Sequence, residues 1–174
     1  RSGMLTQEDS RGLSIEDIRK AIQERMTATI DDRVQALDPE LPAILAGHVT
    51  INGATVGTER SMMLGRDHEL LPSAVIKPQL DYVALGHIHK HQVLRDSRPM
   101  AVYSGSLQRV DFSEEGDDKG FCVVDLDLAA PQGQRLEDFQ FHQVKARPFV
   151  TIDVKVLPGE EDPTQHLAAD TIDL

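Results

Sequence analysis

The sequence predicts an α/β fold of the α+β kind, in which a long amphipathic helix precedes a series of strands. Apolar residues recur every three or four positions near the start, two short apolar runs follow, and shorter strand patterns come after residue 90. The 174 residues are enough for one sizeable domain. With 40% apolar and 27% charged residues the chain is not of the disordered class, and no apolar run approaches the roughly 18 residues that a membrane span requires.

The charge balance is strongly acidic and limits the kinds of partner. Eighteen Lys and Arg against 29 Asp and Glu give a formal net charge of −11, which disfavours nonspecific binding to polyanions. A nucleic-acid ligand would therefore need a local site that overcomes this field. Cys122, the single cysteine, can form no internal disulfide, and the first residues lack the apolar segment of a signal peptide. We expect a reducing, cytoplasmic location and no membrane partner.

The first predicted element is an amphipathic helix between Leu13 and Leu37. Ser14 is a suitable N-cap, acidic residues follow it in the first turn, and Asp38-Pro39 ends the pattern. One face of this helix is expected to pack on a larger body.

Two apolar runs without polar alternation predict strands that are covered on both faces. They are Pro42 to His48 and Asp81 to Leu85, and the second is followed at once by Gly86-His87-Ile88-His89. Between them we expect surface loops and a short helix from Pro72 through Ile76. Both strands therefore end at histidine.

Shorter strands are predicted in the remainder of the chain. The segments His91–Arg95, Met100–Tyr103 and Gly120–Leu126 are typical of a β-meander, and further strands are expected at 139–144 and 149–156. The acidic loop from Glu114 to Gly120 is interpreted as a solvated turn, and no chemistry is assigned to its charge.

Three histidines are the candidate metal ligands: His48, His87 and His89. Imidazoles two positions apart point the same way on an extended backbone, and Gly86 permits unusual dihedrals where the strand becomes a loop. Ligand sites lie outside the carboxyl ends of such strands. Because the only Cys is in a strand interior, an open hydrolytic metal site is favoured over a closed structural zinc site. The other histidines are interpreted as packed or solvated side chains: His68, His91, His142 and His166.

Evidence for a nucleophile is weak. Ser104-Gly105-Ser106 lacks the Gly-x-Ser-x-Gly elbow, and Cys122 has no obvious activating base. Positive residues flank the histidines and either face a phosphodiester or are simply solvated: Arg66, Lys90, Arg95, Arg98 and Arg109.

Longer motifs resemble a known family, the calcineurin-like metallophosphoesterases, and within it the SbcD-type branch of double-strand-break repair nucleases. The segments that carry the resemblance are Ile44–His48, Tyr82–Lys90, and Tyr103–Phe112 with its succeeding Glu114-Glu115 and Lys119-Gly120-Phe121. The resemblance implies a four-layer αββα sandwich, two Mn²⁺ ions, DNA as substrate, homodimerisation, and an SMC-like ATPase partner of the SbcC type. His48 and His87 would ligate one ion and His89 the other. Candidate substrate-binding residues are Lys90, Ser104, Ser106 and Arg109.

The sequence lacks the family's upstream Asp-x-His, Gly-Asp-x-x-Asp and Gly-Asn-His motifs. We therefore expect residues 1–146 to correspond to the C-terminal portion of the phosphoesterase domain and residues 147–174 to the start of a capping domain. The chain alone should be inactive. Two alternatives stay open: another metallophosphoesterase, such as a nucleotidase or cyclic-nucleotide phosphodiesterase, and a noncatalytic binding or assembly module.

Overall fold

The computed structural model describes residues 14–57 and 69–151. Its first element is the predicted helix, α1 (Ile15–Gln35), and a capping box forms at its start. The Ser14 side chain accepts from the backbone N–H of Asp17, whose carboxylate accepts from the backbone N–H of Ser14. The C-terminal half of the helix packs on the core through Met26, Ile30 and Val34, together with Leu37 just after it, while Ile15 is exposed.

A four-stranded mixed sheet forms the centre of the fold and confirms the predicted α+β class. Its order is β1 (Ile44–His48), β4 (Tyr82–Gly86), β6 (Met100–Tyr103) and β5 (Gln92–Arg95). β1, β4 and β6 run parallel, whereas β5 is antiparallel to β6. The carboxyl ends of the first three strands therefore meet at one edge of the sheet.

The prediction that both apolar runs are covered on both faces is correct for β4 and wrong for β1. β4 is largely buried because it lies between β1 and β6. β1 is an edge strand among the described residues, and its residues alternate between exposed and half-buried, with Ile44 48% exposed. The absence of polar alternation in a sequence cannot separate these two environments when small residues such as Ala46 and Gly47 occupy the strand.

A second, very short strand pair lies beyond β1. β2 (Thr50–Ile51) pairs in parallel with β3 (Glu69–Leu70), and α3 (Pro72–Val75) follows. The short helix agrees with the prediction, whereas the two strands occupy positions expected to be loops. Ile51 and Leu70 are almost completely buried, which explains why these few residues are ordered against the core.

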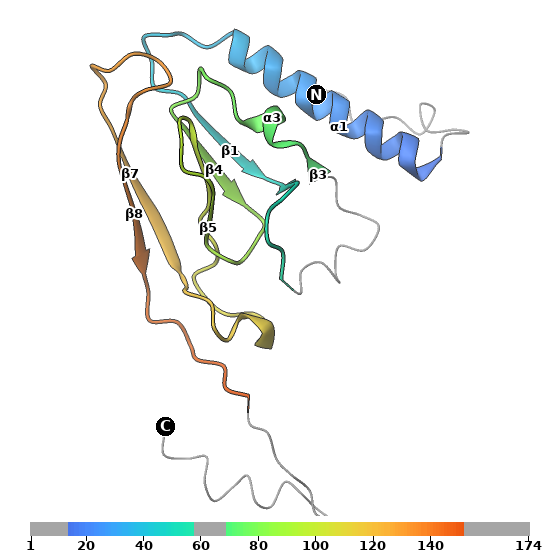
Figure 1. Cartoon of the computed structure of the whole chain (residues 1–174), viewed down its shortest axis with the longest axis vertical. Helices are drawn as coiled ribbons and strands as arrows, with labels where there is room; N and C mark the ends of the chain where they lie inside the picture. Colours follow the sequence, from blue (N-terminus) through green and yellow to red (C-terminus); the bar gives the residue numbers. More distant parts are fainter. Residues whose placement is uncertain (1–13, 58–68, 152–174) are drawn as a thin grey trace, which may run out of the picture.

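The predicted β-meander is wrong. β7 (Gly120–Leu126) does not join β6 but pairs with β8 (Leu136–Gln143) in a separate antiparallel ribbon. Both edges of β6 are already paired, with β4 and β5, so no edge is available to β7. The loop before β7 contains a single 3₁₀ turn, η1 (Phe112–Glu114). The ribbon lies on the side of the sheet opposite α1 (Figure 1).

Aromatic contacts join the ribbon to the sheet. The ring centroids of Tyr82 and Phe139 are 6.3 Å apart, and His91 stacks on Phe141 at 3.9 Å. The described layers are thus helix, four-stranded sheet and two-stranded ribbon. A second helical layer, which the four-layer sandwich requires, is not among residues 14–57 and 69–151 and stays a prediction.

A buried ion pair fixes the end of the ribbon at which β7 connects to β8. Asp81 and Arg135 are 1% and 4% exposed, and their carboxylate and guanidinium lie 3.4 Å apart. Asp81 also accepts from the backbone N–H groups of Ala43 and Arg135. One carboxylate therefore links the segments preceding β1, β4 and β8.

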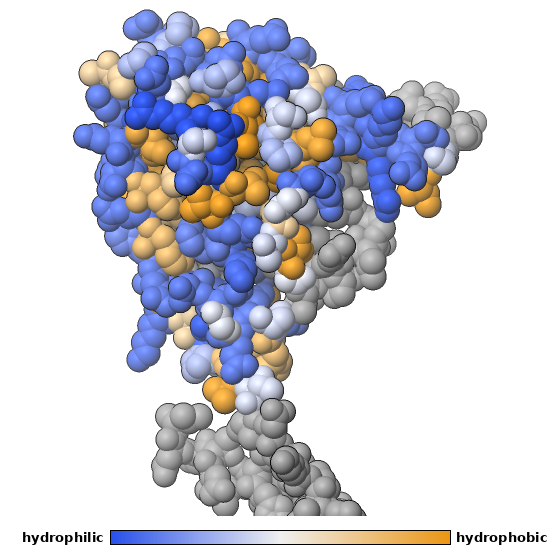
Figure 2. Space-filling model, viewed as in Figure 1, coloured by the Kyte–Doolittle hydropathy of each residue, from blue (hydrophilic) through white to orange (hydrophobic). Residues whose placement is uncertain are grey.

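The visible surface is mainly polar, with apolar residues in small groups between the polar ones (Figure 2). Exposed apolar side chains include Leu107, Val110 and Phe112 in the loop before β7. Phe112 contacts Phe149 at a centroid distance of 4.9 Å. Residues 147–151 contain no regular element, and the rest of the predicted strand 149–156 and of the capping segment 147–174 lies outside the described residues. None of the described helices has both the length and the apolar character needed to cross a membrane.

Candidate functional site

The structure brings two of the predicted histidines into direct contact. His48 is the last residue of β1 and His87 directly follows β4, so their parallel strands deliver them to the same edge of the sheet. His87 Nδ1 and His48 Nε2 are 3.2 Å apart, and the two rings meet edge to face with centroids 4.9 Å apart. His48 is exposed and His87 half-buried, so the pair faces solvent at the end of the sheet.

His87 has a backbone conformation that side chains rarely adopt. Its φ of +94° makes it the only described non-glycine residue with a positive φ. The prediction gave the unusual dihedrals to Gly86, and this is wrong, because Gly86 still belongs to β4 and the chain turns one residue later. Such a conformation costs on the order of 1–3 kcal/mol and is typical of functional positions. It also means that the backbone through His87 is not extended, so the argument that His87 and His89 point the same way no longer applies.

Gly86 is required for a different reason. In the sheet register Gly86 lies opposite His48, and a Cβ on it would come within 3.3 Å of His48 Nδ1. Glycine therefore leaves room for the His48 ring beside β4. The backbone just after His48 is fixed by the buried Tyr103, whose hydroxyl donates to Val49 O and accepts from Ile51 N, both at 2.8 Å. The ring of His48 is thus positioned by the space at Gly86 and by the backbone that Tyr103 fixes, beside His87 at the end of β4.

His89 has a different partner, which the sequence interpretation missed. Its Nδ1 lies 2.9 Å from Glu114 Oε1, and Glu114 Oε2 lies 2.7 Å from the ammonium of Lys119. Glu114 and Lys119 are 3% and 1% exposed. The interpretation of the acidic loop as a solvated turn is therefore wrong for these two residues. The sequence did contain a signal: Glu114 and Lys119 have opposite charges, and Lys119 directly precedes the apolar strand Gly120–Leu126.

Glu114 is held in the ionised form by its surroundings. Burial by itself would raise the pKa of its carboxyl group. Hydrogen bonds from Lys119, His89 and the backbone of Val110, together with the positive charge of Lys119, outweigh that effect and lower the pKa below its ordinary value of 4.5. The carboxylate can then only accept hydrogen bonds.

Arg109 organises the same loop rather than projecting from it. Its guanidinium donates to the backbone carbonyls of Glu114 and Glu115 through Nε, and to Asp117 and Arg147 through its terminal nitrogens. A phosphate contact by Arg109 stays a prediction, because the four carbonyls engage each of its three nitrogens but leave one N–H on each terminal nitrogen without a described backbone acceptor.

The other predicted substrate-binding residues lie around the same loop. Lys90 is exposed and 3.7 Å from Asp117. The backbone N–H of Ser104 donates to Leu85 O, and the backbone N–H of Ser106 donates to His89 O at 3.0 Å. Their roles toward substrate stay predictions.

The His48 and His87 pair fits one metal ion by its donor chemistry. Two nitrogen ligands at about 2.1 Å from one ion lie roughly 2.9–3.4 Å apart for octahedral to tetrahedral angles, and the observed separation is 3.2 Å. Within residues 14–57 and 69–151, no group of three or more His, Cys, Asp or Glu side chains is arranged to hold a metal. Convergence of all three predicted histidines on one centre therefore stays a prediction.

The remaining histidines and the cysteine lie elsewhere. His91 donates through Nδ1 to Tyr103 O and stacks on Phe141, and His142 is exposed and stacks on Phe121. Burial raises the pKa of the Cys122 thiol, which agrees with its interpretation as an inert half-buried residue. His68, His166 and Arg66 lie outside the described residues.

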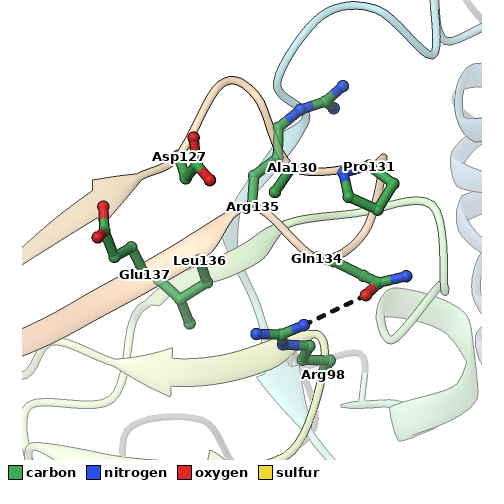
Figure 3. A pocket seen from close by; sticks show the side chains of 8 residues that line it. All are labelled: Arg98, Asp127, Ala130, Pro131, Gln134, Arg135, Leu136 and Glu137. Carbon is green, nitrogen blue, oxygen red and sulfur yellow. Dashed lines mark hydrogen bonds between the residues drawn. The ribbon is translucent and has the colours of Figure 1, made fainter.

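A cavity of about 340 Å³ lies at the other end of the sheet. It is lined by Arg98, Asp127, Gln134, Arg135 and Glu137, among others, and Figure 3 shows Arg98 bonded to Gln134 across it. These residues precede β6, join β7 to β8 or begin β8, and Arg135 contacts the segments before β1 and β4. The cavity is therefore separated from the histidines by the length of the strands.

Together, the parallel ends of β1 and β4 bring His48 and the left-handed His87 to one edge of the sheet, where sheets of this kind place ligand sites. No protein-family model matches the chain. The particular relatives are two curated proteins, each named as the SbcD component of the nuclease SbcCD. The protein from Rhodobacter capsulatus is 38% identical over 96 residues, covering 54% of this chain and 23% of the relative. The protein from Staphylococcus epidermidis is 30% identical over 106 residues, covering 60% and 27%.

These matches confirm the resemblance to the SbcD type. They also show that the chain spans about a quarter of the length of these curated relatives. The activity, substrates and partners of the whole protein are accordingly matters for proposal.

Proposed function

We propose that the protein is a metal-dependent DNA nuclease of the SbcD type that hydrolyses phosphodiester bonds during double-strand-break repair and recombination, with exonuclease and endonuclease activity. The observation that carries this proposal is the 3.2 Å contact between His48 and His87 at adjacent parallel strand ends, in a chain similar to nuclease components. The histidine pair alone fits many phosphoesterases. The similarity to proteins named as nuclease components supports a nucleic-acid substrate, here proposed to be DNA, over small nucleotides.

In this proposal His48 and His87 would hold one Mn²⁺ ion and His89 the second. When bound, the ions would supply an activated water and charge neutralisation at the phosphate oxygens. The contribution of this chain is to fix the imidazoles: Tyr103 anchors the backbone after His48, and the turn at His87 brings its ring to His48. Because the sequence lacks the carboxylate motifs of the family, this chain by itself is expected to be inactive.

The partners proposed are DNA, an SbcC-like SMC ATPase, and a second copy of the whole protein. The net charge of −11 argues that the acidic surface of this chain does not bind DNA broadly. The same charge is the observation that favours the rival proposal, a noncatalytic assembly module. Under that proposal the histidine pair would bind no metal, and replacing these histidines would not change the rate of DNA cleavage.

The test is a nuclease assay with a polypeptide of the relatives' length that contains this segment. Linear duplex DNA is incubated with Mn²⁺ or with a chelator, and small nucleotides are offered in parallel. We expect DNA cleavage that needs the metal and falls by at least about 100-fold in His87→Ala. His142→Ala is the matched control, because this histidine is exposed on the ribbon, and it should cleave normally. Equal cleavage by His87→Ala, or cleavage in the chelator, refutes the proposal, while preference for small nucleotides supports the other phosphoesterase class.

A further inference from the structure

We infer that Glu114 is the positioning residue of His89: its carboxylate accepts a hydrogen bond from Nδ1–H of the imidazole, so that the lone pair lies on Nε2. The inference deepens the proposed function and rests on it for its catalytic meaning. Neither the predicted site residues nor the names of the relatives assign a role to Glu114.

The first observation is the geometry at the ring. Glu114 Oε1 is 2.9 Å from His89 Nδ1, the length of a charge-assisted hydrogen bond. A carboxylate has no proton to give, so the proton in this contact belongs to Nδ1. A neutral imidazole with its proton on Nδ1 presents Nε2 as its acceptor or ligand nitrogen.

The second observation is that Glu114 itself is immobilised and charged. Its other oxygen, Oε2, is 2.7 Å from Lys119 Nζ and accepts from Val110 N at 3.2 Å. Lys119 also lies 3.8 Å from a carboxylate oxygen of Asp117, and its side chain is 0% exposed. Burying an ammonium and a carboxylate together costs desolvation energy on both sides. The burial of this pair is therefore not expected of a turn whose charges are simply solvated.

The third observation is that the same lysine holds the backbone of His89. Lys119 Nζ donates to His89 O at 3.1 Å, and the backbone N–H of Ser106 donates to the same carbonyl at 3.0 Å. Gly105 approaches so closely that a Cβ on it would be 2.9 Å from His89 O. Ring and backbone of His89 are thus both tied to one loop, residues 104–119.

These contacts match a recurring arrangement. A histidine that binds a metal usually donates its other ring N–H to a carboxylate, which fixes the tautomer and raises the basicity of the ligand nitrogen. His89 has this carboxylate, and it comes from a loop whose conformation Arg109 fixes by donating to the carbonyls of Glu114, Glu115 and Asp117. The loop between β6 and β7 therefore serves as the support of the second metal ligand.

The test uses the full chain and ¹⁵N nuclear magnetic resonance of the histidine side chains at neutral pH. The His89 signals are assigned by comparison with His89→Gln. We expect wild-type His89 to be the Nδ1–H tautomer, and Glu114→Gln to shift it toward a mixture with Nε2–H. Glu115→Gln is the matched control, because the neighbouring carboxylate accepts from Thr151 and not from a histidine.

A second readout separates this inference from the proposed function. Co²⁺ titration of the same variants reports on the His48 and His87 pair, so binding should be unchanged in Glu114→Gln and in Glu115→Gln and weakened in His87→Ala. An Nε2–H tautomer in the wild type, or one unaltered in Glu114→Gln, overturns the inference even if His87→Ala loses Co²⁺. If the wild type binds no Co²⁺, the proposed function fails, and the tautomer still decides the role of Glu114.

Should Glu114→Gln not fold, Glu114→Asp is the second variant. It keeps the negative charge beside Lys119 but is too short to reach His89 Nδ1, so it should give the same tautomer shift.

Discussion

Replacing Arg135 by methionine should loosen the ribbon from the sheet. The guanidinium donates to Asp81 Oδ2 at 3.4 Å, to Leu41 O at 2.8 Å and to Pro39 O at 2.7 Å. Methionine keeps a similar apolar stem and removes the charge. Asp81 would retain two backbone donors, from Ala43 and from residue 135, but would lose its counter-charge while 1% exposed.

The magnitude follows from three effects. Leaving one member of a buried ion pair without its partner costs about 3–5 kcal/mol. The carbonyls of Pro39 and Leu41 belong to exposed residues, so water can replace the lost donors there. Arg135 Nε is buried and has no hydrogen-bond partner among the described residues, and its removal returns about 1 kcal/mol. The net loss in the free energy of unfolding should therefore be about 3 kcal/mol.

The assay is urea unfolding of the full chain followed by circular dichroism. With a slope of about 2 kcal/mol per molar, a loss of about 3 kcal/mol lowers the midpoint by about 1.5 M. Arg98→Met is the matched control: Arg98 lines the same cavity but is exposed and makes a single 3.4 Å bond to Gln134, so its change should stay within about 0.5 kcal/mol. An Arg135→Met midpoint indistinguishable from that of Arg98→Met would refute the reasoning.

Three further predictions concern the loop and the thiol. Gly105→Ala should destabilise the chain by about 2 kcal/mol, because Gly105 has a φ of +80° and the new Cβ would be 2.8 Å from His91 N, whereas Gly116→Ala, with no atom within 4 Å, should have little effect in the same urea assay. Because the pKa of Glu114 is lowered in the folded state, its stabilisation is present above about pH 4.5 and is lost as the pH falls through the folded pKa, so acid unfolding of Glu114→Gln should depend less on pH than that of the wild type; parallel curves would contradict this. Cys122 should react with an alkylating reagent more slowly than free cysteine at pH 8 and at the same rate in denaturant, since burial raises its pKa; equal native rates would contradict this.

Local patterns predicted most of the elements, because their causes are local. The periodicity and the Ser14 cap locate α1, and the runs at β4, β6 and β7 give those strands nearly residue by residue. Strand pairing was not predictable in the same way. β7 pairs with β8 and not with β6, because β4 and β5 already occupy both edges of β6. No local sequence pattern encodes this arrangement.

In the candidate site, too, the features with local causes were predictable and those that depend on tertiary packing were not. The positions of His48 and His87 at the ends of two predicted strands indicated that they would lie close together, and their rings are in contact. The burial of Glu114 and Lys119 depends on a loop folded by Arg109 over His89, so composition alone indicated a solvated turn. The conformation of His87 likewise reflects the position at which β4 ends, one residue later than the glycine suggested.

The most direct test of the central claim is Co²⁺ binding to the full chain, measured by absorption spectroscopy, in the wild type, His48→Ala and His87→Ala. Co²⁺ binds imidazole more tightly than Mn²⁺ does, which suits a site with few ligands. Because the facing nitrogens of the two histidines are 3.2 Å apart, both should contribute to one ion, and either substitution should weaken binding by at least about tenfold. His142→Ala should bind as the wild type does. Wild-type binding that survives both substitutions, or no binding at all, would contradict a metal centre built on this pair.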